Sequence, residues 1–380
     1  PQPNSSAASD VYKRQVSNSA DFQKNNFFEW VIGANYLELK ESNLKKDDGL
    51  YGDPSDPYGP YASASSSSSR YKSSNFSVFG NLDYLLSASL KFSIGLRWED
   101  WDAEYSDSLK ESFNPTDKMS GGKISLIKNM TNGTNMYASL AKGYKQGGFN
   151  LGLGLDANST NKNLAYDPEF LTNYELGVNT KLLDSRITFN GVLFYSDRED
   201  QQVLISTQTD PSDPNTFSFL TQNAAEGVNH GLEINMDMDI NESLSAFVNL
   251  GILKTEIKNW ESRQDLEGRA QAHAPERSYA VGLNWTPTSH TYLAIDFTGK
   301  SSFYYSDSHN NKSKSYVLTN LNLGYVNNHW NYELWARNIF DEYYSVRGFY
   351  FGNEAPNFID TLYERHGDPR HIGLSVRYDF

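Results

Sequence analysis

Cysteine is absent from this sequence of 380 residues. The chain therefore has no disulfide framework, no cysteine-ligated zinc or iron–sulfur site and no thiol nucleophile. An excess of positive charge is absent as well, since 33 Lys and Arg stand against 47 Asp and Glu and give a net charge of −14. Because nucleic-acid-binding proteins present basic surfaces, this balance argues against nucleic acid as a partner.

Long hydrophobic runs are also missing. A membrane-spanning helix needs about 20 consecutive, mostly apolar residues, whereas the most apolar stretches here, such as residues 84–98, are interrupted repeatedly by Ser, Lys, Gly or Arg. The chain is nevertheless rich in aromatic residues, with 7 Trp, 25 Tyr and 21 Phe. The absence of a helix leaves open the other structure that crosses a membrane, a closed β-barrel, whose hydropathy signal per strand is weak.

Residues 1–26 differ in composition from the rest of the chain. They are rich in Ser and Asn and contain neither the apolar core of a signal peptide nor the alternating pattern that follows. We interpret residues 1–26 as a disordered leader or a truncation scar, and residues 27–380 as the folded part. A run of Ser and Ala at residues 62–69 predicts a flexible surface segment.

Apolar residues from Phe27 onward recur at every second position, which indicates strands rather than helices. The segments run for ten or more residues, the length that a tilted strand needs to cross a bilayer. Strands of soluble sandwiches are usually about 5–6 residues long. Two of these alternating rows are Leu90, Phe92, Ile94, Leu96 and Trp98, and Leu232, Ile234, Met236, Met238 and Ile240.

Short and long connections alternate between these segments. Tight turns on one side and long loops on the other are typical of an outer-membrane barrel, and the pattern predicts about fourteen antiparallel strands in an all-β transmembrane barrel. The predicted short joints lie near residues 86–88, 131–134, 183–184, 241–243, 286–289 and 327–328. The predicted long polar stretches are residues 40–72, 105–117, 150–166, 208–215, 261–272, 304–314 and 344–367.

Several segments carry motifs that occur together, in this order, in one known family. They are Tyr-Ala-Ser-Leu-Ala-Lys-Gly-Tyr-Lys-Gln-Gly-Gly-Phe-Asn at 137–150, Tyr-Asp-Pro-Glu at 166–169, Asn-Tyr-Glu-Leu-Gly-Val-Asn at 173–179, Gly-Leu-Glu at 231–233, Ala-Arg-Asn-Ile-Phe-Asp-Glu-Tyr at 336–343, and Gly-Asp-Pro-Arg at 367–370 before the terminal Phe380. With these motifs, residues 27–380 resemble TonB-dependent outer-membrane receptors, in particular siderophore receptors.

The resemblance implies a 22-stranded barrel whose lumen is filled by an N-terminal plug domain. It implies a location in the bacterial outer membrane and active import of a ferric siderophore or a similar scarce nutrient, energised by the TonB complex through the plug, without a cofactor. Relative to that pattern, the chain is expected to hold the C-terminal part of the barrel, about 14 of 22 strands, without the plug. Outer-membrane lipid with lipopolysaccharide and the barrel-assembly machinery are further implied partners.

The resemblance also indicates which residues bind the ligand, because family members recognise it with long loops and the upper wall of the lumen. Arg and Lys there can bind carboxylates or phosphates, and aromatic rings can stack on a flat ligand. The alternative for each residue is an ordinary solvated loop side chain. The candidate ligand-binding residues are Tyr144, Lys145, Phe149, Arg269, His273, Arg277, Arg347, Phe349 and Tyr350.

Three further groups of residues have predicted roles. The polar side chains Asn173, Glu175, Asn179, Glu233, Asn235 and Asp237 are expected to face the lumen, where they contact either a plug or water. The alternating end of the chain, Ile372, Leu374, Val376, Tyr378 and Phe380, resembles the signal that the barrel-assembly machinery reads, and is equally a lipid-facing strand. Aromatic residues near strand ends are expected to form interfacial girdles: Trp30, Trp98, Trp101, Tyr195, Trp285 and Trp330.

Enzyme motifs are absent from the sequence. There is no Gly-x-Ser-x-Gly, no His-Glu-x-x-His, no P-loop and no metal-ligand spacing among the 7 His. Acid-rich stretches at residues 53–56 and 307–309 are interpreted as negative loop surface rather than as calcium sites. The alternatives to a TonB-dependent receptor are a passive pore of porin type, an outer-membrane enzyme, and a soluble β-propeller, which would show repeated four-stranded blades.

Overall fold

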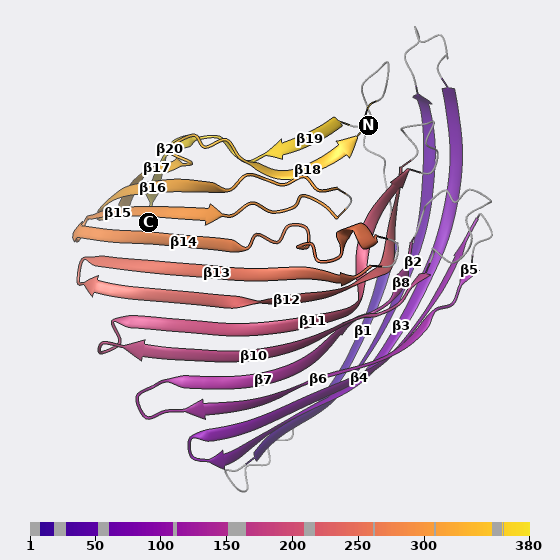
Figure 1. Cartoon of the computed structure of the whole chain (residues 1–380), viewed down its shortest axis with the longest axis horizontal. Helices are drawn as coiled ribbons and strands as arrows, with labels where there is room; N and C mark the ends of the chain where they lie inside the picture. The colour runs from indigo at the N-terminus through magenta and orange to yellow at the C-terminus, as the bar shows by residue number, and fades with distance from the viewer. Residues whose placement is uncertain are drawn as a thin grey trace.

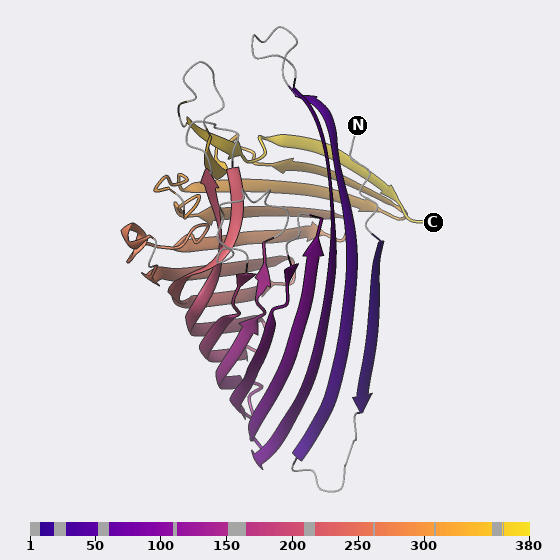
Figure 2. The same ribbon diagram turned by 90° about the vertical axis from the view of Figure 1, so that its right-hand side faces the viewer.

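The computed structural model describes residues 8–18, 28–51, 61–108, 112–150, 165–208, 217–260, 263–307, 309–351, 359 and 361–380. One 16-stranded antiparallel sheet dominates these residues, with the strands in sequence order along the sheet and only β5 off the main path. Figure 1 shows the strands side by side, with the short turns at one end of the sheet and the extended strand ends at the other. Figure 2 shows that the sheet bends through a wide arc.

The strands of this sheet match the predicted all-β architecture, and their number is close to the prediction of about fourteen. The first part consists of β1 (Ala8–Asn18), β2 (Phe28–Tyr51), β3 (Tyr61–Ser87), β4 (Leu90–Asp107), β5 (Ser112–Phe113), β6 (Thr116–Asn129), β7 (Asn135–Lys145) and β10 (Glu169–Leu182). The second part consists of β11 (Ile187–Gln208), β12 (Phe217–Asn241), β13 (Leu244–Asn259), β14 (Arg277–Thr288), β15 (Thr291–Lys300), β16 (Tyr316–Asn327), β17 (Trp330–Arg337) and β20 (His371–Tyr378).

Smaller elements lie at the extended ends of these strands. Two short hairpins pair β8 (Gly148–Phe149) with β9 (Ala165–Tyr166) and β18 (Ser345–Phe351) with β19 (Thr361–His366). A 3-10 helix, η2 (Gln264–Leu266), follows β13. No helix among the described residues is long and apolar enough to span a membrane.

The register separates an apolar face of the sheet from a polar face. Leu176 of β10 pairs with Leu193 of β11, which pairs with Leu232 of β12, which pairs with Ile252 of β13. The next residue along each strand points to the opposite face, since the side-chain period of a strand is two. Apolar side chains on this face are largely exposed, for example Leu176 at 59% and Leu193 at 54%. The apolar face therefore has no protein layer covering it in the described part of the chain.

The sheet is open within the described residues. Strand β1 pairs with β2 at one edge and β20 pairs with β17 at the other, and no pairing between β1 and β20 is recorded there. No strand was expected in residues 1–26, which lack alternating apolar residues. The structure instead places Ala8–Asn18 in register with β2, through backbone pairing that needs no alternation of side chains.

The predicted tight turns agree with the structure. Turn residues lie at 88–89, 183–186, 242–243, 289–290 and 328–329, and Gly133 has a φ of 80° in the turn between β6 and β7. Only glycine adopts such a backbone without steric cost, which explains the Asn-Gly pair at this joint.

Two predicted long loops contain paired strands instead. Residues 344–367 include the hairpin of β18 and β19. Residues 40–72 were expected to form a polar loop, but β2 continues to Tyr51 and β3 begins at Tyr61, so most of this stretch is a hairpin. The Ser and Ala run at 62–69 belongs to β3 and pairs with β2. A polar strand that projects beyond the apolar band still satisfies its backbone by pairing, so polarity alone did not distinguish it from a loop. The predicted loops at 150–166 and 208–215 lie largely outside the described residues.

Candidate functional site

The predicted lumen-wall residues share the polar face of the sheet. Asn179 of β10 pairs with Asn190 of β11, which pairs with Asn235 of β12, so the amide side chains form one row. Glu233 and Asp237 lie at alternate positions of the same strand as Asn235.

Neighbouring polar side chains on this wall bind one another. The Asn173 amide donates to Glu175 at 2.7 Å and accepts from Ser196 Oγ at 2.7 Å. The wall is therefore a pre-organised polar surface, and contact with a plug stays a prediction.

A charged cluster occupies the same face further along the sheet, around Glu99. This carboxylate is 6% exposed and forms a salt bridge with Arg97 at 2.6 Å. The hydroxyl of Tyr144 donates to Glu99 at 2.9 Å, and the Asn75 amide donates to the same carboxylate. Tyr144, a predicted ligand residue, thus has its hydroxyl bound within the wall.

An aromatic cluster lies beside this charged group. The ring of Phe149 is 5.4 Å from Tyr71 and 5.1 Å from Tyr105, and Phe113 stacks on Tyr105 at 6.2 Å. The cluster packs against Trp101, which is 1% exposed. Phe149 was predicted to contact ligand from a loop, and its ring belongs to this packed aromatic cluster. Lys145 lies at the end of β7, where it pairs with Glu169 and is exposed.

Trp101 corrects one prediction for the girdle. Its indole N–H donates to Ser73 Oγ at 2.7 Å on the polar face, where the side chain is buried. Trp98, three positions earlier, lies on the apolar face and is 41% exposed. An odd separation along a strand places two residues on opposite faces. The spacing of Trp98 and Trp101 therefore already indicated that only one of them faces the apolar side.

The other girdle aromatics lie on the apolar face. Tyr195, Trp285 and Trp330 are 44%, 46% and 44% exposed. Trp30 pairs with Leu82, an apolar-face residue of β3.

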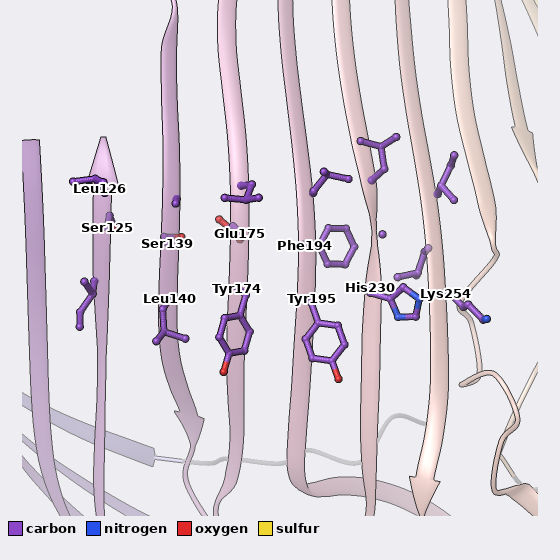
Figure 3. Close-up of a pocket in the computed structure, with 18 of the residues that line it drawn as sticks. Ser125, Leu126, Ser139, Leu140, Tyr174, Glu175, Phe194, Tyr195, His230 and Lys254 are labelled. Atoms are coloured by element: carbon purple, nitrogen blue, oxygen red, sulfur yellow. The ribbon is translucent and has the colours of Figure 1, made fainter. Parts of the chain in front are cut away.

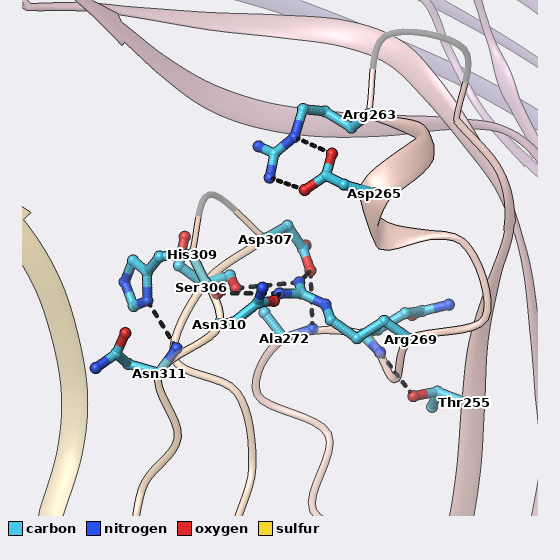
Figure 4. Close-up of polar contacts among 11 residues, drawn as sticks. Thr255, Arg263, Asp265, Arg269, Ala272, Ser306, Asp307, His309, Asn310 and Asn311 are labelled. Carbon is cyan, nitrogen blue, oxygen red and sulfur yellow. Dashed lines mark hydrogen bonds and ion pairs between the residues drawn. The ribbon is translucent and has the colours of Figure 1, made fainter.

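Arg269 anchors one extended connection to the next (Figure 4). Its guanidinium donates to Asp307 at 2.8 Å, to Asn310 at 2.9 Å, and to the backbone oxygens of Ser306 and His309 at 3.2 and 3.0 Å. The same group lies 4.4 Å from the ring centroid of Tyr304. Its side chain is only 8% exposed. Arg269 was predicted to bind ligand, but its donors hold residues 304–310.

The two neighbouring candidates differ from Arg269. His273 has a φ of 56° and its ring lies 5.7 Å from Phe303. Arg277 begins β14, where its backbone pairs with Ser301, and the residue is exposed. Both residues are exposed. Arg277 pairs with Ile252, so its side chain lies on the apolar face and not on the polar wall.

The hairpin of β18 and β19 packs beside the loop that Arg269 anchors. Tyr350 donates to Asn311 at 3.1 Å and its ring lies 5.0 Å from that of His309. Phe349 stacks on Tyr363 at 5.9 Å, and Arg347 is exposed.

Below the hairpin, burial and a hydrogen bond to Glu364 raise the pKa of Tyr305 to about 12. This hydroxyl therefore stays protonated at neutral pH.

The structure thus gathers the predicted ligand residues into two groups. Contacts of Arg269 and Tyr350 join the β13–β14, β15–β16 and β17–β20 connections into one group. Tyr144 and Phe149 belong to a second group, near β4. No group of three or more possible metal ligands occurs among the described residues.

Asn338 is a buried residue whose importance the sequence analysis missed. It is 4% exposed with a φ of 47°, and its amide donates to the backbone oxygens of Glu342 and Asp368 at 2.9 and 3.1 Å. Arg370 N–H donates to Asp341 at 2.8 Å. The motifs at 336–343 and 367–370 therefore hold each other in place.

The predicted assembly strand is β20, which pairs with β17 from Trp330↔Tyr378 to Arg337↔His371. Its apolar-face residues are exposed, with Leu374 at 68% and Ile372 at 65%. Phe380 follows the strand and its ring lies 5.0 Å from that of Tyr378. Recognition by the barrel-assembly machinery stays a prediction.

Comparison with known proteins identifies the family. A model described as "TonB dependent receptor-like, beta-barrel" matches residues 2–339. The chain belongs to the TonB-dependent receptor β-barrel family. Barrels of this family reside in the bacterial outer membrane and are non-enzymatic transporters. The apolar face is therefore the lipid-facing side of this receptor barrel and the polar face lines its lumen.

Solved receptors share the fold. The ferric yersiniabactin uptake receptor FyuA from Yersinia pestis is 18% identical with a TM-score of 0.76, covering 98% of this chain and 54% of that one. The siderophore receptor PiuA from Acinetobacter baumannii is 17% identical with a TM-score of 0.71, covering 98% and 56%.

A curated relative gives a similar picture. The pesticin receptor of Yersinia pestis is 22% identical over 267 residues, 68% of this chain and 36% of that protein. The chain therefore spans about half the length of these solved receptors and 36% of the length of the pesticin receptor. The copper transporter OprC also shares the fold, with 13% identity and a TM-score of 0.70.

Proposed function

We propose that this protein forms barrel wall of an active-transport receptor that imports a ferric siderophore or a similar scarce nutrient. The sheet, which includes β1, then forms the C-terminal part of a barrel whose lumen holds a plug. The observation that carries the proposal is the two-sided sheet, whose apolar face suits lipid and whose polar wall is topped by arginine-anchored connections. Relatives whose names refer to siderophores support a ferric siderophore as the imported nutrient. The copper transporter supports copper as an alternative.

In this proposal, the ligand first binds at the long-loop end of the lumen. The exposed Arg347 offers a guanidinium group, which binds carboxylate or phosphate oxygens in pairs. The exposed ring of Phe349 offers a surface on which a flat chelate can stack. Arg269 acts one step away, by fixing the loop on which these surfaces rest. Energy from the TonB complex then rearranges the plug and releases the ligand into the periplasm.

The test is uptake by cells that express the full-length receptor from its own gene. Radioactive iron is supplied as ferric hydroxamate, ferric catecholate or ferric phenolate complexes, with copper as a separate arm, in strains with and without a working TonB complex. The proposal expects saturable uptake of at least one iron complex that disappears without TonB. Uptake that is linear in concentration and indifferent to TonB would instead identify a passive pore.

Two variants separate binding from transport. Arg347→Gln is expected to raise the half-saturating concentration about tenfold, because a charge-assisted hydrogen bond contributes about 1.5–3 kcal/mol. Asp184→Asn, in the short turn at the opposite end of the sheet, is the matched control and leaves uptake unchanged. Equal effects of both variants would contradict a ligand site at the long-loop end.

A further inference from the structure

The hairpin of β18 and β19 changes register near its base. Ser345 pairs with His366, but the next pair along the hairpin is Arg347 with Arg365. If the first register had continued, Arg347 would lie opposite Glu364. An extra residue in β18 therefore replaces a pair of opposite charges by two arginines that face each other, and such bulges are common beside functional sites.

Contacts fix the register on both sides of this bulge. Below it, the ring of His366 is hydrogen-bonded to the hydroxyl of Ser345 at 3.1 Å. Above it, the ring of Tyr305 lies over Gly348, where an added Cβ would clash, and the Tyr305 hydroxyl donates to Glu364. The opposed arginines are therefore a consequence of how the hairpin packs on the connection between β15 and β16.

The hairpin has two different faces. The face with Glu364 packs on the β15–β16 connection through Tyr305. The opposite face carries the two arginines and, two residues further along each strand, Phe349 and Tyr363, which pair with each other. Their rings stack at 5.9 Å, and Phe349 is 48% exposed. This face therefore presents two guanidinium groups beside a pair of aromatic rings.

The two arginines have no recorded counter-charge. Within the described residues no salt bridge to Arg347 or Arg365 is recorded, and both residues are exposed. Glu364 lies on the other face of the hairpin, and Asp307 of the adjacent connection is bound to Arg269. Like charges directly opposite each other destabilise a pair of strands. An anion bound between the two guanidinium groups would remove this repulsion.

We propose that this face of the hairpin selects a negatively charged ferric complex whose chelating groups are aromatic. The guanidinium groups of Arg347 and Arg365 bind the anionic oxygens of the complex, and the rings of Phe349 and Tyr363 pack against its aryl groups. This proposal rests on the proposed function, because it names the chemical class of the imported complex. It adds Arg365 and Tyr363 to the residues expected to contact the ligand.

Isothermal titration calorimetry on the purified full-length receptor tests the ligand class. A ferric tris-catecholate is anionic and aromatic, ferric citrate is anionic without rings, and a ferric tris-hydroxamate is neutral. The catecholate is expected to bind about tenfold more tightly than either of the others. Equal or tighter binding of ferric citrate would refute the role of the rings. Equal or tighter binding of the hydroxamate would refute the role of the charge.

Two variants test the residues themselves. Arg365→Gln is expected to weaken catecholate binding about tenfold, as the loss of a charge-assisted hydrogen bond predicts. Phe349→Leu keeps an apolar side chain but loses the ring, and is expected to weaken catecholate binding about threefold. Neither variant is expected to change the affinity for the hydroxamate. Unchanged catecholate binding in Arg365→Gln would overturn the proposal.

The chain offers controls that remove a positive charge elsewhere. Arg277→Gln removes an exposed arginine whose side chain lies on the apolar face. Lys254→Gln removes a lysine from the same face, where Figure 3 shows it in line with His230 and Tyr195. Both are expected to bind the catecholate as wild type does. If either weakens binding as much as Arg365→Gln, the overall charge of the receptor attracts the anion and the hairpin does not select it.

The stability of the ligand-free hairpin separates ligand binding from a structural role. Because the two arginines repel each other, hydrogen exchange in peptides that contain Gly348 is expected to be as slow in Arg365→Gln as in wild type, or slower. Faster exchange would show that Arg365 stabilises the hairpin and would overturn the proposal. Uptake is measured in parallel. Selective catecholate binding without TonB-dependent uptake would count only against the proposed function, and TonB-dependent uptake that prefers the hydroxamate would count only against this ligand class.

Discussion

Some side chains in this barrel pack over a glycine of the neighbouring strand. The ring of Tyr137 lies over Gly177 of the adjacent strand, and a Cβ added at Gly177 would lie 2.1 Å from that ring. Both residues belong to motifs of the family, at 137–150 and 173–179. Their contact supplies a physical reason for a glycine in the middle of a strand, where it otherwise weakens the sheet.

Gly177→Ala is therefore expected to destabilise the barrel by about 1–3 kcal/mol, because the Tyr137 ring must leave its site on the lumen wall. The matched control is Gly143→Ala, since nothing lies within 4 Å of a Cβ at Gly143. The measurement is the temperature at which the folded protein changes its mobility on a gel in sodium dodecyl sulfate. Equal transition temperatures for the two variants would refute the close contact.

Arg269 is a second residue whose role is set by its neighbours. With its side chain 8% exposed and bound to several oxygens, Arg269→Gln is expected to cost the loop at 304–310 about 2–3 kcal/mol of local stability. Limited proteolysis should then cut this loop several times faster than in wild type. Arg277→Gln, which removes an exposed arginine nearby, should leave the cleavage rate unchanged.

This pair of variants also separates two roles for Arg269. If Arg269 contacted the ligand directly, as its sequence position predicted, Arg269→Gln would weaken ligand binding without changing the cleavage rate. A change in cleavage rate identifies it as a residue that positions the loop.

On the scale of the elements, the stability of the loop after β15 is expected to depend on pH. Burial lowers the pKa of His309 below 6.5, and the Arg269 guanidinium lowers it further, although the Gly348 backbone acts in the opposite direction. Nδ1 of His309 accepts a hydrogen bond from the Asn311 N–H at 3.3 Å, and Tyr350 packs on the ring. The carboxylate of Asp307 is held by Arg269 on the same loop.

Because the folded loop favours neutral His309, its stabilisation is complete above pH 6.5 and is lost as the pH falls through the lower folded pKa. Hydrogen exchange in peptides that contain Asn311 is expected to be faster at pH 5 than at pH 7.5, after correction for the intrinsic rate. In His309→Gln, which cannot be protonated, the corrected rates should not differ between the two pH values. A pH dependence that persists in this variant would assign the effect elsewhere.

The C-terminal elements depend on Asn338 in a similar way. Asn338→Ala removes the bonds to Glu342 and Asp368 and places alanine at a φ of 47°, so a loss of about 2–4 kcal/mol is expected. Asn338→Gly removes the same bonds without the backbone strain and should be less harmful. Chemical denaturation of the purified receptor measures both. Equal stability of wild type and Asn338→Ala would contradict the role assigned to this residue.

The sequence predicted strands well wherever one face had to be apolar. In β11 and β12, alternation fixed which residues share a face, and the structure agrees. Alternation could not find β1, which is held by backbone pairing, nor the polar ends of β2 and β3. The candidate site was harder to predict, because the contacts of Arg269 and Asn338 join segments that lie about 30–40 residues apart. Side-chain period says nothing about such contacts.

On the scale of the whole molecule, the two faces of the sheet differ in polarity, and this division decides which face meets lipid. Leu176, Leu193 and Leu232 share the apolar face, and Glu175 and Glu233 share the polar face, where contact with water or a plug is predicted. The proposed ligand path depends on this division, because it lies on the polar face. The chain contains no cysteine, so a single cysteine introduced into it meets no background signal from these 380 residues.

The most direct measurement is therefore a spin-label scan of β10 in the full-length receptor, with single cysteines from Asn173 to Asn179 in native outer-membrane lipid. Labels at 174, 176 and 178 are expected to collide with oxygen, which concentrates in the bilayer. Labels at 173, 175 and 179 are expected to collide with a water-soluble nickel chelate. Gly177 is left unlabelled, because a side chain there would clash with the Tyr137 ring. A scan without this two-residue period, or one with the two faces exchanged, would contradict the account.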